Sequence, residues 1–320
     1  MNNQKNQVAI VFPGQGSQIV GMGKDLFDNF KSARDVFEIV DENLGYKLSN
    51  IIFSGPNEEL TKTENTQPAL MAVSMAIIKV LESDFGKKFT DLCSITAGHS
   101  LGEYSALCAS GSFNIANTAK LLKIRGQAMA KCGASVKSEG AMAAILGADI
   151  IDILKLIEEV KQDEVCQIAN DNSTGQIVIS GNKSAIIRAV EKAKDFGIKK
   201  VIMLPVSGAF HSQLMRDAEI TMSEALSKIE VSNSKVPVIA NISAQIVGNS
   251  STIVESLVKQ ITGTVKWRET MLFMEQQGIK KIIEIGSGKV LAGLATRTCS
   301  SFSALSIQNI ADIENFCNNH

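Results

Sequence analysis

A serine stands at the centre of a short glycine-flanked motif, residues 98–102, which reads G-H-S-L-G. The motif follows a short apolar run and precedes a segment with helical spacing, and this is the context that the G-x-S-x-G nucleophile elbow requires. In such an elbow a sharp turn exposes the serine hydroxyl at the N-terminus of a helix, where unpaired N–H groups favour negative charge. The pattern alone is also compatible with an ordinary loop serine. Its position between the two predicted elements favours Ser100 as a nucleophile.

A serine hydroxyl is a weak nucleophile unless a base removes its proton, and only three histidines are present to do so. His320 is the last residue and is expected to fray. His99 adjoins the serine, and neighbouring side chains of an elbow point in different directions. His211 follows a predicted strand, at the sheet edge where open α/β proteins place their sites, so it is the preferred base. No Asp or Glu stands out as a residue that would orient His211, which disfavours an ordinary hydrolase triad.

Two further glycine-rich segments, residues 12–18 (F-P-G-Q-G-S-Q) and 286–290 (G-S-G-K-V), do not match nucleotide-binding motifs. The first has Ile19 at the third glycine position of the dinucleotide fingerprint, and the second lacks the spacing and the Ser/Thr of a P-loop. In acyl chemistry the first segment could supply a backbone N–H to an oxyanion, alongside that of Leu101. The same glycines could equally serve only to turn the chain.

The composition disfavours nucleic acid and membranes as partners. A net charge of −1 and an aromatic content of 5% supply neither a basic field nor stacking rings for nucleic acid. No apolar run reaches the roughly 18 residues of a membrane span, and nothing at the polar N-terminus predicts a signal peptide. The six scattered cysteines and three histidines lack metal-ligand spacing. We therefore expect no metal, and reduced thiols in a cytoplasmic protein.

The elements that must position Ser100 and His211 follow from the hydrophobic pattern. Buried strands are predicted at residues 8–12, 93–97, 236–241 and 281–285, and helices at 66–81, 101–109 and 114–131. Pro68 is accommodated in the first turn of its helix, and Asn114 caps the last of these helices. Strands that alternate with helices indicate an α/β fold, with a mostly parallel sheet that helices cover on both faces.

The middle of the chain has a different pattern. Strands are predicted at residues 141–146, 165–169, 176–180 and 200–204, helices at 150–160 and 184–196, and a turn at 170–175. This β-α-β-β-α-β order is that of the split ferredoxin-like unit. At 320 residues the chain is long enough for a large domain with a small one. We therefore predict an inserted small domain at 134–203, within a larger domain formed by residues 1–133 and 204–320.

Four motifs, in order, resemble those of the malonyl-CoA:acyl carrier protein transacylases. They are residues 12–18, 98–107, 208–212 and 284–291, and the resemblance extends over residues 8–298. It implies an α/β-hydrolase-like large domain with an inserted ferredoxin-like small domain, in agreement with the pattern above. It also implies that Ser100 is the nucleophile, that His211 is the base, and that the amides of Gln15 and Leu101 are the oxyanion donors.

The same resemblance assigns two further residues. The family arginine that pairs with the malonyl carboxylate falls on Arg125, whose planar fork suits a carboxylate, although most helix arginines are simply solvated. The main-chain carbonyl that orients the histidine falls on Gln260, which would account for the missing acid. Thr264 stands where many relatives carry a proline, and this departure bears on the assignment of Gln260. Residues 209–211 (A-F-H) resemble the version associated with malonyl rather than methylmalonyl selection in related polyketide acyltransferases.

The reaction implied by the resemblance is a ping-pong transfer of the malonyl group from malonyl-CoA to the phosphopantetheine thiol of acyl carrier protein, through a malonyl-serine ester, for fatty acid synthesis. It requires no metal or bound cofactor. Two alternatives remain open: a serine esterase or thioesterase that delivers the acyl group to water, and a non-catalytic module whose ferredoxin-like unit docks a partner. An acidic carrier protein is expected to bind a basic face, but the scattered cations Lys199, Lys200, Lys266 and Arg268 do not define one.

Overall fold

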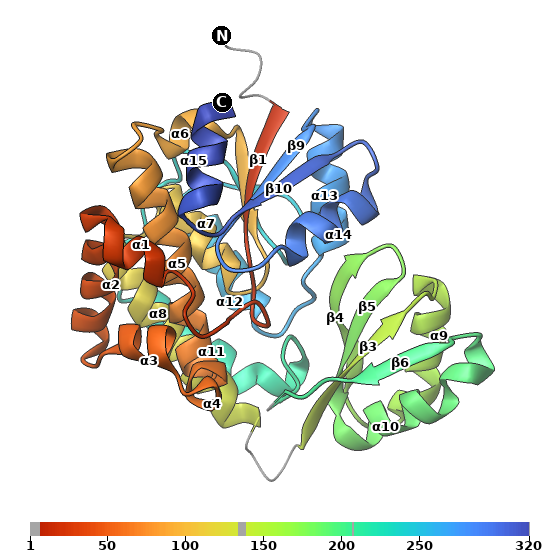
Figure 1. The fold of residues 1–320 in the computed structure, drawn as a ribbon. Helices are drawn as coiled ribbons and strands as arrows, with labels where there is room; N and C mark the ends of the chain where they lie inside the picture. Colours follow the sequence, from red (N-terminus) through yellow and green to blue (C-terminus); the bar gives the residue numbers. More distant parts are fainter. Residues whose placement is uncertain (1–6, 134–138, 207, 320) are drawn as a thin grey trace.

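The computed structural model describes residues 7–133, 139–206 and 208–319, whose strands form two separate sheets (Figure 1). The strands of the first sheet lie in the order β10 (Ser303–Ile307), β9 (Lys281–Ile285), β1 (Val8–Phe12), β2 (Ile95–Gly98), β7 (Val238–Ile239) and β8 (Ile246–Val247). Neighbours from β10 to β7 are parallel, and only the edge strand β8 pairs antiparallel. The predicted mostly parallel sheet of an α/β protein is confirmed.

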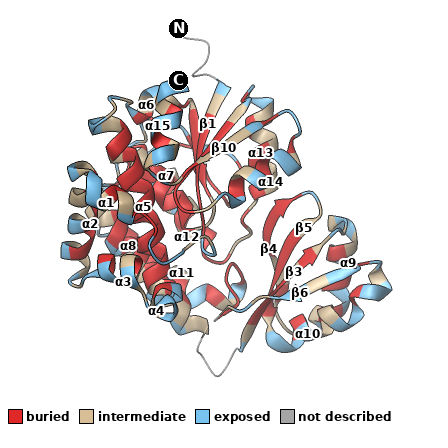
Figure 2. Ribbon diagram, in the orientation of Figure 1, coloured by how far each residue is buried: buried red, intermediate tan, exposed pale blue. Residues whose placement is uncertain are grey.

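Strand β1 shows how one apolar run serves both faces of this sheet. Ile10 and Phe12 belong to the core shared with α2 (Lys31–Leu44), α5 (Thr63–Ser83) and α8 (Ile115–Gly133). Ala9 and Val11 belong to the core on the other side, shared with α13 (Trp267–Gln276) and α14 (Val290–Thr298). Successive side chains of a strand point to opposite faces, so a continuous apolar run is what a sheet buried on both faces requires. Figure 2 shows the strands of this sheet buried between layers of helices.

Further helices complete the part of the chain around this sheet. They are α1 (Lys24–Asn29), α3 (Leu48–Ser54), α4 (Asn57–Thr61), α6 (Phe89–Leu92), α7 (Gly102–Ala109), η3 (Gln213–Met215), α11 (Arg216–Leu226), α12 (Ser250–Gln260) and α15 (Ile310–Asn319).

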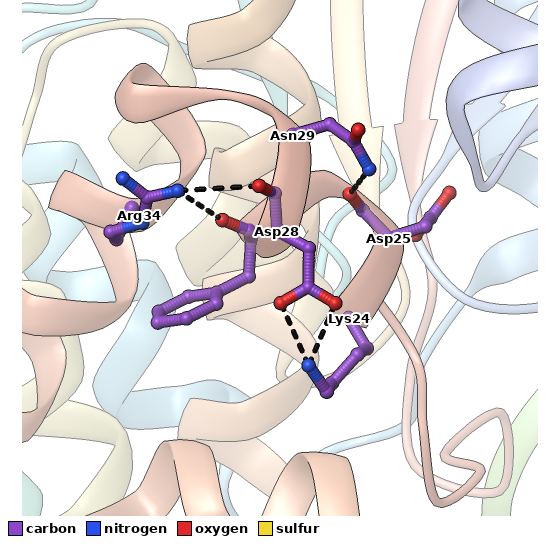
Figure 3. Close-up of polar contacts among 6 residues, drawn as sticks. Lys24, Asp25, Asp28, Asn29 and Arg34 are labelled. Carbon is purple, nitrogen blue, oxygen red and sulfur yellow. Dashed lines mark hydrogen bonds and ion pairs between the residues drawn. The ribbon is translucent and has the colours of Figure 1, made fainter.

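Figure 3 shows the polar contacts at the C-terminal end of α1. Arg34 donates to the carbonyl oxygens of Phe27 at 3.2 Å and Asp28 at 3.3 Å, and a cation at a helix C-terminus interacts favourably with the helix dipole. Asn29 also donates to the Asp25 carbonyl at 2.9 Å, and Lys24 pairs with Asp28.

The second sheet is antiparallel throughout, in the order β4 (Cys166–Ser173), β5 (Gln176–Asn182), β3 (Gly140–Leu146) and β6 (Lys200–Met203). The helices α9 (Ile150–Lys161) and α10 (Lys183–Lys192), with the 3₁₀ turn η2 (Ala193–Phe196), pack on the face that carries Ala143, Ile145 and Ile179. The opposite face presents Met142 and Val178 to the core of the first part of the chain. The chain order β3-α9-β4-β5-α10-β6 is the predicted one.

Backbone and side-chain bonds attach β4 to the segment that precedes α13. The amide of Asp171 donates to the Val265 carbonyl at 3.0 Å, and the amide of Val265 donates to the Ala169 carbonyl at 2.8 Å. Thr264 donates its hydroxyl to the Ile168 carbonyl at 2.6 Å. The buried carboxylate of Asp171 pairs with Arg268 at 2.9 Å, so this arginine belongs to a contact between the second sheet and helix α13.

The predicted turn at 170–175 is wrong in its extent. Strand β4 continues to Ser173, which pairs with Gln176 of β5, while Asp171 bonds to Val265 on the other side, and only residues 174 and 175 turn. Two other details also differ from the prediction. Helix α5 begins at Thr63, which places Pro68 in the second turn, and the strand predicted at 236–241 is reduced to β7 because Ala240 turns back to bond with Gln245 at 3.0 Å.

No helix among the described residues combines the length and the apolar character that crossing a membrane requires. The six cysteines all lie in the described segments, and no disulfide joins them. Cys132 and Cys317 are only partly buried, whereas the other four are buried.

Candidate active site

Ser100 lies on the turn between β2 and α7, and its φ of 54° is in the left-handed region that non-glycine residues rarely adopt. The flanking glycines permit this turn. A Cβ on Gly98 would lie 1.9 Å from the carbonyl carbon and oxygen of Gly102, and a Cβ on Gly102 would lie 2.3 Å from the Phe12 carbonyl oxygen. Strand and helix therefore approach each other too closely for any side chain at these two positions, which is the geometry of the predicted elbow.

Asn241 holds the elbow from the turn that follows the neighbouring strand β7. Its side-chain oxygen accepts the N–H of Ser100 at 2.7 Å, and its side-chain nitrogen donates to the Gly98 carbonyl at 2.7 Å. The side chain is fully buried. The sequence analysis did not single out Asn241, although it ends the apolar segment 236–241 and so lies at the carboxyl edge of the sheet, where α/β proteins place their sites.

The hydroxyl oxygen of Ser100 lies 2.8 Å from Nε2 of His211. The other ring nitrogen, Nδ1, lies 2.9 Å from the main-chain carbonyl oxygen of Gln260. A carbonyl only accepts, so Nδ1 carries the proton, and Nε2 of the neutral ring accepts the proton of the serine hydroxyl. Burial, followed by the positive charge of Arg125, lowers the pKa of His211 from 6.5 to about 3. The ring is therefore neutral near pH 7 and able to take up a proton.

The side chain of His99 bonds elsewhere and not to the Ser100 hydroxyl. His99 places Nε2 2.8 Å from the side-chain oxygen of Asn172 on β4, and its ring packs against Trp267 with 5.5 Å between the ring centroids. His320 lies outside the described residues. The preference for His211 over His99 agrees with this geometry.

Arg125 is the third group at the serine hydroxyl. Its Nη2 donates to the Ser100 hydroxyl oxygen at 3.1 Å and to Oε1 of Gln260 at 2.8 Å, and its Nη1 donates to Oε1 of Gln67 at 2.8 Å. A Cβ on Gly126 would lie 2.5 Å from Cα of Glu64, so this glycine lets α8 and α5 pack closely enough for Arg125 to reach Gln67.

The guanidinium of Arg125 is 1% exposed, and burial lowers its pKa. Within the described ranges no carboxylate lies at ion-pair distance from it, and its Nε has no hydrogen-bond partner there. Neutral amide oxygens orient the group, and the carboxyl group of Glu103 acts on its charge only from beyond ion-pair distance. A buried cation without a counter-ion is costly, and a planar fork in this condition is suited to bind a carboxylate.

These residues line a pocket of about 380 Å³ between the two sheets. Gln15, Leu101 and Arg125 lie in its wall beside the Ser–His pair, and Met142 and Asn170 contribute from the second sheet. No acceptor among the described residues is bonded to the backbone amide of Gln15 or Leu101. Two backbone donors are thus available beside the serine for an oxyanion.

A buried carboxyl group, that of Glu103 in the first turn of α7, lies against these residues. Burial raises its pKa to about 7. It bonds to Gln260 and Asn241 rather than to His211. The imidazole is therefore oriented by a main-chain carbonyl, as the resemblance implied for Gln260, and has no carboxylate partner in the described structure.

Gln167, on β4, was also missed by the sequence analysis. Its side-chain nitrogen donates to the carbonyl oxygens of His211 at 3.3 Å and Thr262 at 3.2 Å, and its side-chain oxygen accepts the N–H of Gln213 at 3.1 Å. The second sheet thereby links the loop of His211 to the chain that follows Gln260. Within the described segments, no three His, Cys, Asp or Glu side chains gather as metal ligands would.

Comparison with known proteins places this geometry in a family. Residues 9–315 match the family model described as acyl transferase domain. The chain is 40% identical, over 311 residues, to a malonyl CoA-acyl carrier protein transacylase of Bacillus subtilis, with 97% of this chain and 96% of that protein covered.

Solved structures give the same result. The crystal structure of an acyl-carrier-protein-S-malonyltransferase from Bartonella henselae is similar with a TM-score of 0.93 and 49% identity, over 98% of both chains. A malonyl-transacylase solved in complex with its type II PKS acyl-carrier protein is similar with a TM-score of 0.93 and 38% identity, over 98% of this chain and all of that one.

Proposed function

The chain belongs to the acyl transferase family of the malonyl CoA-acyl carrier protein transacylases, and we propose that it transfers the malonyl group of malonyl-CoA to the phosphopantetheine thiol of acyl carrier protein through Ser100, for fatty acid synthesis. One observation carries the proposal. The Ser100 hydroxyl lies between an imidazole nitrogen at 2.8 Å, which can take its proton, and a buried guanidinium nitrogen at 3.1 Å, which has no carboxylate at ion-pair distance in the described structure. The first contact suits acyl transfer and the second suits an acyl group that carries a carboxylate.

In the first half-reaction His211 removes the proton of Ser100 as the serine oxygen bonds to the thioester carbon. The charge on the carbonyl oxygen is stabilised by the amides of Gln15 and Leu101, and each such donor typically contributes about 3 kcal/mol to the transition state. When the tetrahedral intermediate collapses, the carbon–sulfur bond breaks and the imidazolium returns its proton to the leaving sulfur. The products are CoA as the free thiol and a malonyl ester on Ser100.

In the second half-reaction the carrier-protein thiol is the nucleophile and the Ser100 oxygen is the leaving group. His211 takes the proton of the carrier-protein thiol, the sulfur attacks the ester carbon, and the oxyanion is bound at the same two amides. Collapse breaks the bond to the serine oxygen, which regains the proton from His211. Because one thioester is exchanged for another, the sequence balances without a metal or a redox cofactor.

Arg125 would bind the malonyl carboxylate in both half-reactions. Its Nη2 already contacts the Ser100 oxygen, so a carboxylate on the guanidinium would hold the neighbouring carbonyl close to the nucleophile. The ion pair would also compensate the cost of burying Arg125. This is the feature that favours a dicarboxylic acyl group over an acetyl group.

We also propose domain boundaries and a cellular compartment for the enzyme. We assign residues 1–133 and 204–320 to an α/β-hydrolase-like catalytic domain and residues 134–203 to an inserted ferredoxin-like domain. The antiparallel sheet order and the position of all its strands between Gly140 and Met203 support this assignment. Six cysteines without a disulfide suit a reducing compartment, and we assign the enzyme to the cytoplasm.

Intact-mass spectrometry tests the function against the rival hydrolase. Mixed with malonyl-CoA alone, the protein is expected to gain the mass of one malonyl group, to keep it while no thiol acceptor is present, and to lose it when holo acyl carrier protein is added. The Ser100→Ala variant is expected to gain no mass. Release of free malonate without an acceptor would identify a thioesterase, and an unmodified wild-type protein would leave only the binding-module alternative.

A further inference from the structure

Gln260 contacts the reacting groups through both its main chain and its side chain. The main-chain carbonyl accepts from His211 at 2.9 Å, while the side-chain Oε1 accepts from Arg125 at 2.8 Å. The side-chain Nε2 donates to the Ser100 carbonyl at 3.0 Å. The residue is fully buried. One glutamine thus joins the base, the nucleophile and the cation of the pocket.

Only one orientation of the Gln260 side chain supports Arg125. An amide presents an acceptor on one side and two donors on the other, and rotation by half a turn exchanges them. In the reversed orientation the NH₂ group would face the guanidinium, which has only donors. Arg125 would then lose one of its two amide acceptors and meet a repulsive dipole instead. The function of Arg125 therefore depends on whatever fixes this amide.

Glu103 is placed to fix it. Oε2 of Glu103 accepts from Nε2 of Gln260 at 2.7 Å and from the backbone N–H of Asn241 at 3.0 Å. An acceptor at this position requires the NH₂ group of Gln260 to face it, and so turns Oε1 toward Arg125. The other NH₂ contact, the Ser100 carbonyl, is longer and already accepts the N–H of Glu103 at 3.1 Å.

The second oxygen of Glu103 allows Oε2 to remain an acceptor when the carboxyl group is protonated. Oε1 is buried and has no hydrogen-bond partner in the described structure. A proton can reside there without disturbing the two bonds to Oε2. A glutamine at position 103 could likewise place its oxygen at the Oε2 position and its nitrogen at the position without a partner.

We propose that Glu103 is a positioning residue for acyl-group selection, which fixes the side-chain amide of Gln260 so that Oε1 holds Arg125 in place for the substrate carboxylate. Through the Asn241 amide it also supports the residue that holds the Ser100 N–H. The inference rests on the proposed function, in which Arg125 binds the malonyl carboxylate. Glu103 itself touches none of the reacting atoms.

The test compares the rates of acyl-enzyme formation from malonyl-CoA and from acetyl-CoA, measured by quenched intact-mass spectrometry. The ratio of the two rates is the malonyl preference. Glu103→Met removes both acceptor oxygens at similar volume, and it is expected to lower the preference about tenfold or more, as loss of a bond in a charged network does. Glu103→Gln retains the acceptor and is expected to stay within about twofold of wild type.

Glu284 provides the matched control. It is a fully buried carboxyl group whose pKa burial also raises to about 7, with one oxygen on the Ala292 amide at 2.8 Å and the other without a partner in the described structure. It is absent from the residues that line the pocket. Glu284→Met is expected to lower the thermal midpoint while leaving the malonyl preference at the wild-type value. An equal loss of preference in Glu284→Met would overturn the proposal.

A double-mutant cycle tests whether Glu103 acts through Gln260. Gln260→Met removes the side-chain amide and keeps the main-chain carbonyl that His211 uses. It is expected to reproduce the loss of preference, and the double variant is expected to lose no more than either single one. Fold-changes that multiply would show that the two residues act separately and would overturn the proposal. If Glu103→Met fails to fold, the Gln260→Met variant decides the test by itself. A wild-type malonyl preference in that variant overturns the proposal.

Arg125→Ala separates this inference from the function on which it rests. Loss of the malonyl preference in Arg125→Ala, with a normal preference in Glu103→Met, overturns only the role of Glu103. A normal preference in Arg125→Ala overturns the carboxylate-binding role of Arg125, and the inference about Glu103 with it.

Discussion

Ser100 and His211 meet at 2.8 Å while both backbones are in the left-handed region, with φ angles of 54° and 56°. Such conformations cost of order 1–3 kcal/mol each for non-glycine residues and persist only where surrounding contacts impose them. Asn241 holds the N–H of Ser100, and Gln167 holds the carbonyl of His211. The strain thus lies at the two residues that must meet, and each is restrained by an amide side chain from a distant segment of the chain.

The first prediction concerns the pH dependence of acylation. Burial, then the charge of Arg125, lowers the pKa of His211 to about 3, so the free enzyme keeps a neutral base well below the ordinary imidazole value of 6.5. The value of kcat/KM for acyl-enzyme formation is therefore expected to stay level as the pH falls through 6.5 and to decline only in more acidic buffer. A wild-type acid limb centred near pH 6.5 would contradict this assignment.

Removing the positive charge of Arg125 is expected to shift that acid limb. Arg125→Ala removes the second-largest cause of the lowered pKa of His211, so the limb measured with acetyl-CoA should move to higher pH. Arg125→Lys keeps the charge and serves as the control, with a limb close to that of wild type. An unchanged limb in Arg125→Ala would mean that burial alone sets the pKa of His211.

Acyl selectivity is the subject of the next prediction. Removing one partner of a buried charge pair typically costs 2–5 kcal/mol, so Arg125→Ala is expected to slow malonyl loading by roughly 30-fold or more. Acetyl loading, which needs no cation, is expected to persist or rise. The measurement is the mass of the acyl-enzyme after equal times with each thioester. Equal losses for both acyl groups would assign Arg125 to the support of Ser100 instead of the substrate.

How much of this site could be predicted depended on the distance along the chain between the interacting groups. The elbow around Ser100 is local, because strand, turn and helix all lie within residues 95–109, and its glycines follow from backbone contact. His211 could be preferred because only three histidines exist. Arg125, Gln15 and Gln260 came from resemblance to a family, since no local pattern distinguishes them from ordinary polar residues.

The residues that support the site could not be found in this way. Asn241 and Gln167 act through neutral amides on segments 141 and 44 residues from their partners, and an amide leaves no charge or periodicity in a sequence. The extension of β4 to Ser173 is a further case, because pairing with β5 up to Gln176 and with Val265 at Asp171 overrides the turn-forming composition of residues 170–175. Long-range hydrogen bonds of this kind are visible only once the fold is known.

The elbow glycines provide a prediction of stability together with activity. Gly98→Ala would put a Cβ 1.9 Å from the Gly102 carbonyl, and overpacking against backbone costs about 1–3 kcal/mol or more. The variant is expected to melt at lower temperature and to form no malonyl-enzyme. Gly293→Ala is the control, because its Cβ would meet nothing within 4 Å and alanine favours a helix by up to about 1 kcal/mol. A fully active Gly98→Ala protein would mean that the elbow can relax.

Glu284 allows a prediction about stability and pH. Burial raises its pKa from 4.5 to about 7, so between these values the folded protein binds the proton more tightly than the unfolded chain. The free energy of unfolding contributed by this group is therefore complete below pH 4.5 and falls as the pH rises to about 7. Glu284→Gln cannot ionise and is expected to be more stable than wild type at pH 8, by on the order of 3 kcal/mol. Urea unfolding at pH 8 and at pH 4.5 measures the difference, which should shrink at the lower pH.

Gln167 allows a separate test of whether the second sheet positions the catalytic base. Gln167→Ala removes the donor to the carbonyls of His211 and Thr262, and a small displacement of a catalytic group can cost up to about 100-fold in rate. We expect acylation to slow about tenfold for malonyl and acetyl groups alike, because Arg125 is untouched. Gln176→Ala, which removes a glutamine side chain of the same sheet that accepts from the exposed Arg297, is expected to keep the wild-type rate.

Gln167→Glu makes the test more stringent. The substitution retains the size of the side chain but sets a carboxylate against the carbonyl oxygens of His211 and Thr262, so that attraction becomes repulsion. At pH 8 this variant is expected to be slower than Gln167→Ala, and lowering the pH should recover part of the rate as the carboxyl group gains a proton that it can donate. Wild-type rates in both variants would mean that the backbone of His211 keeps its left-handed conformation without Gln167, and that the second sheet lines the pocket but does not position the base.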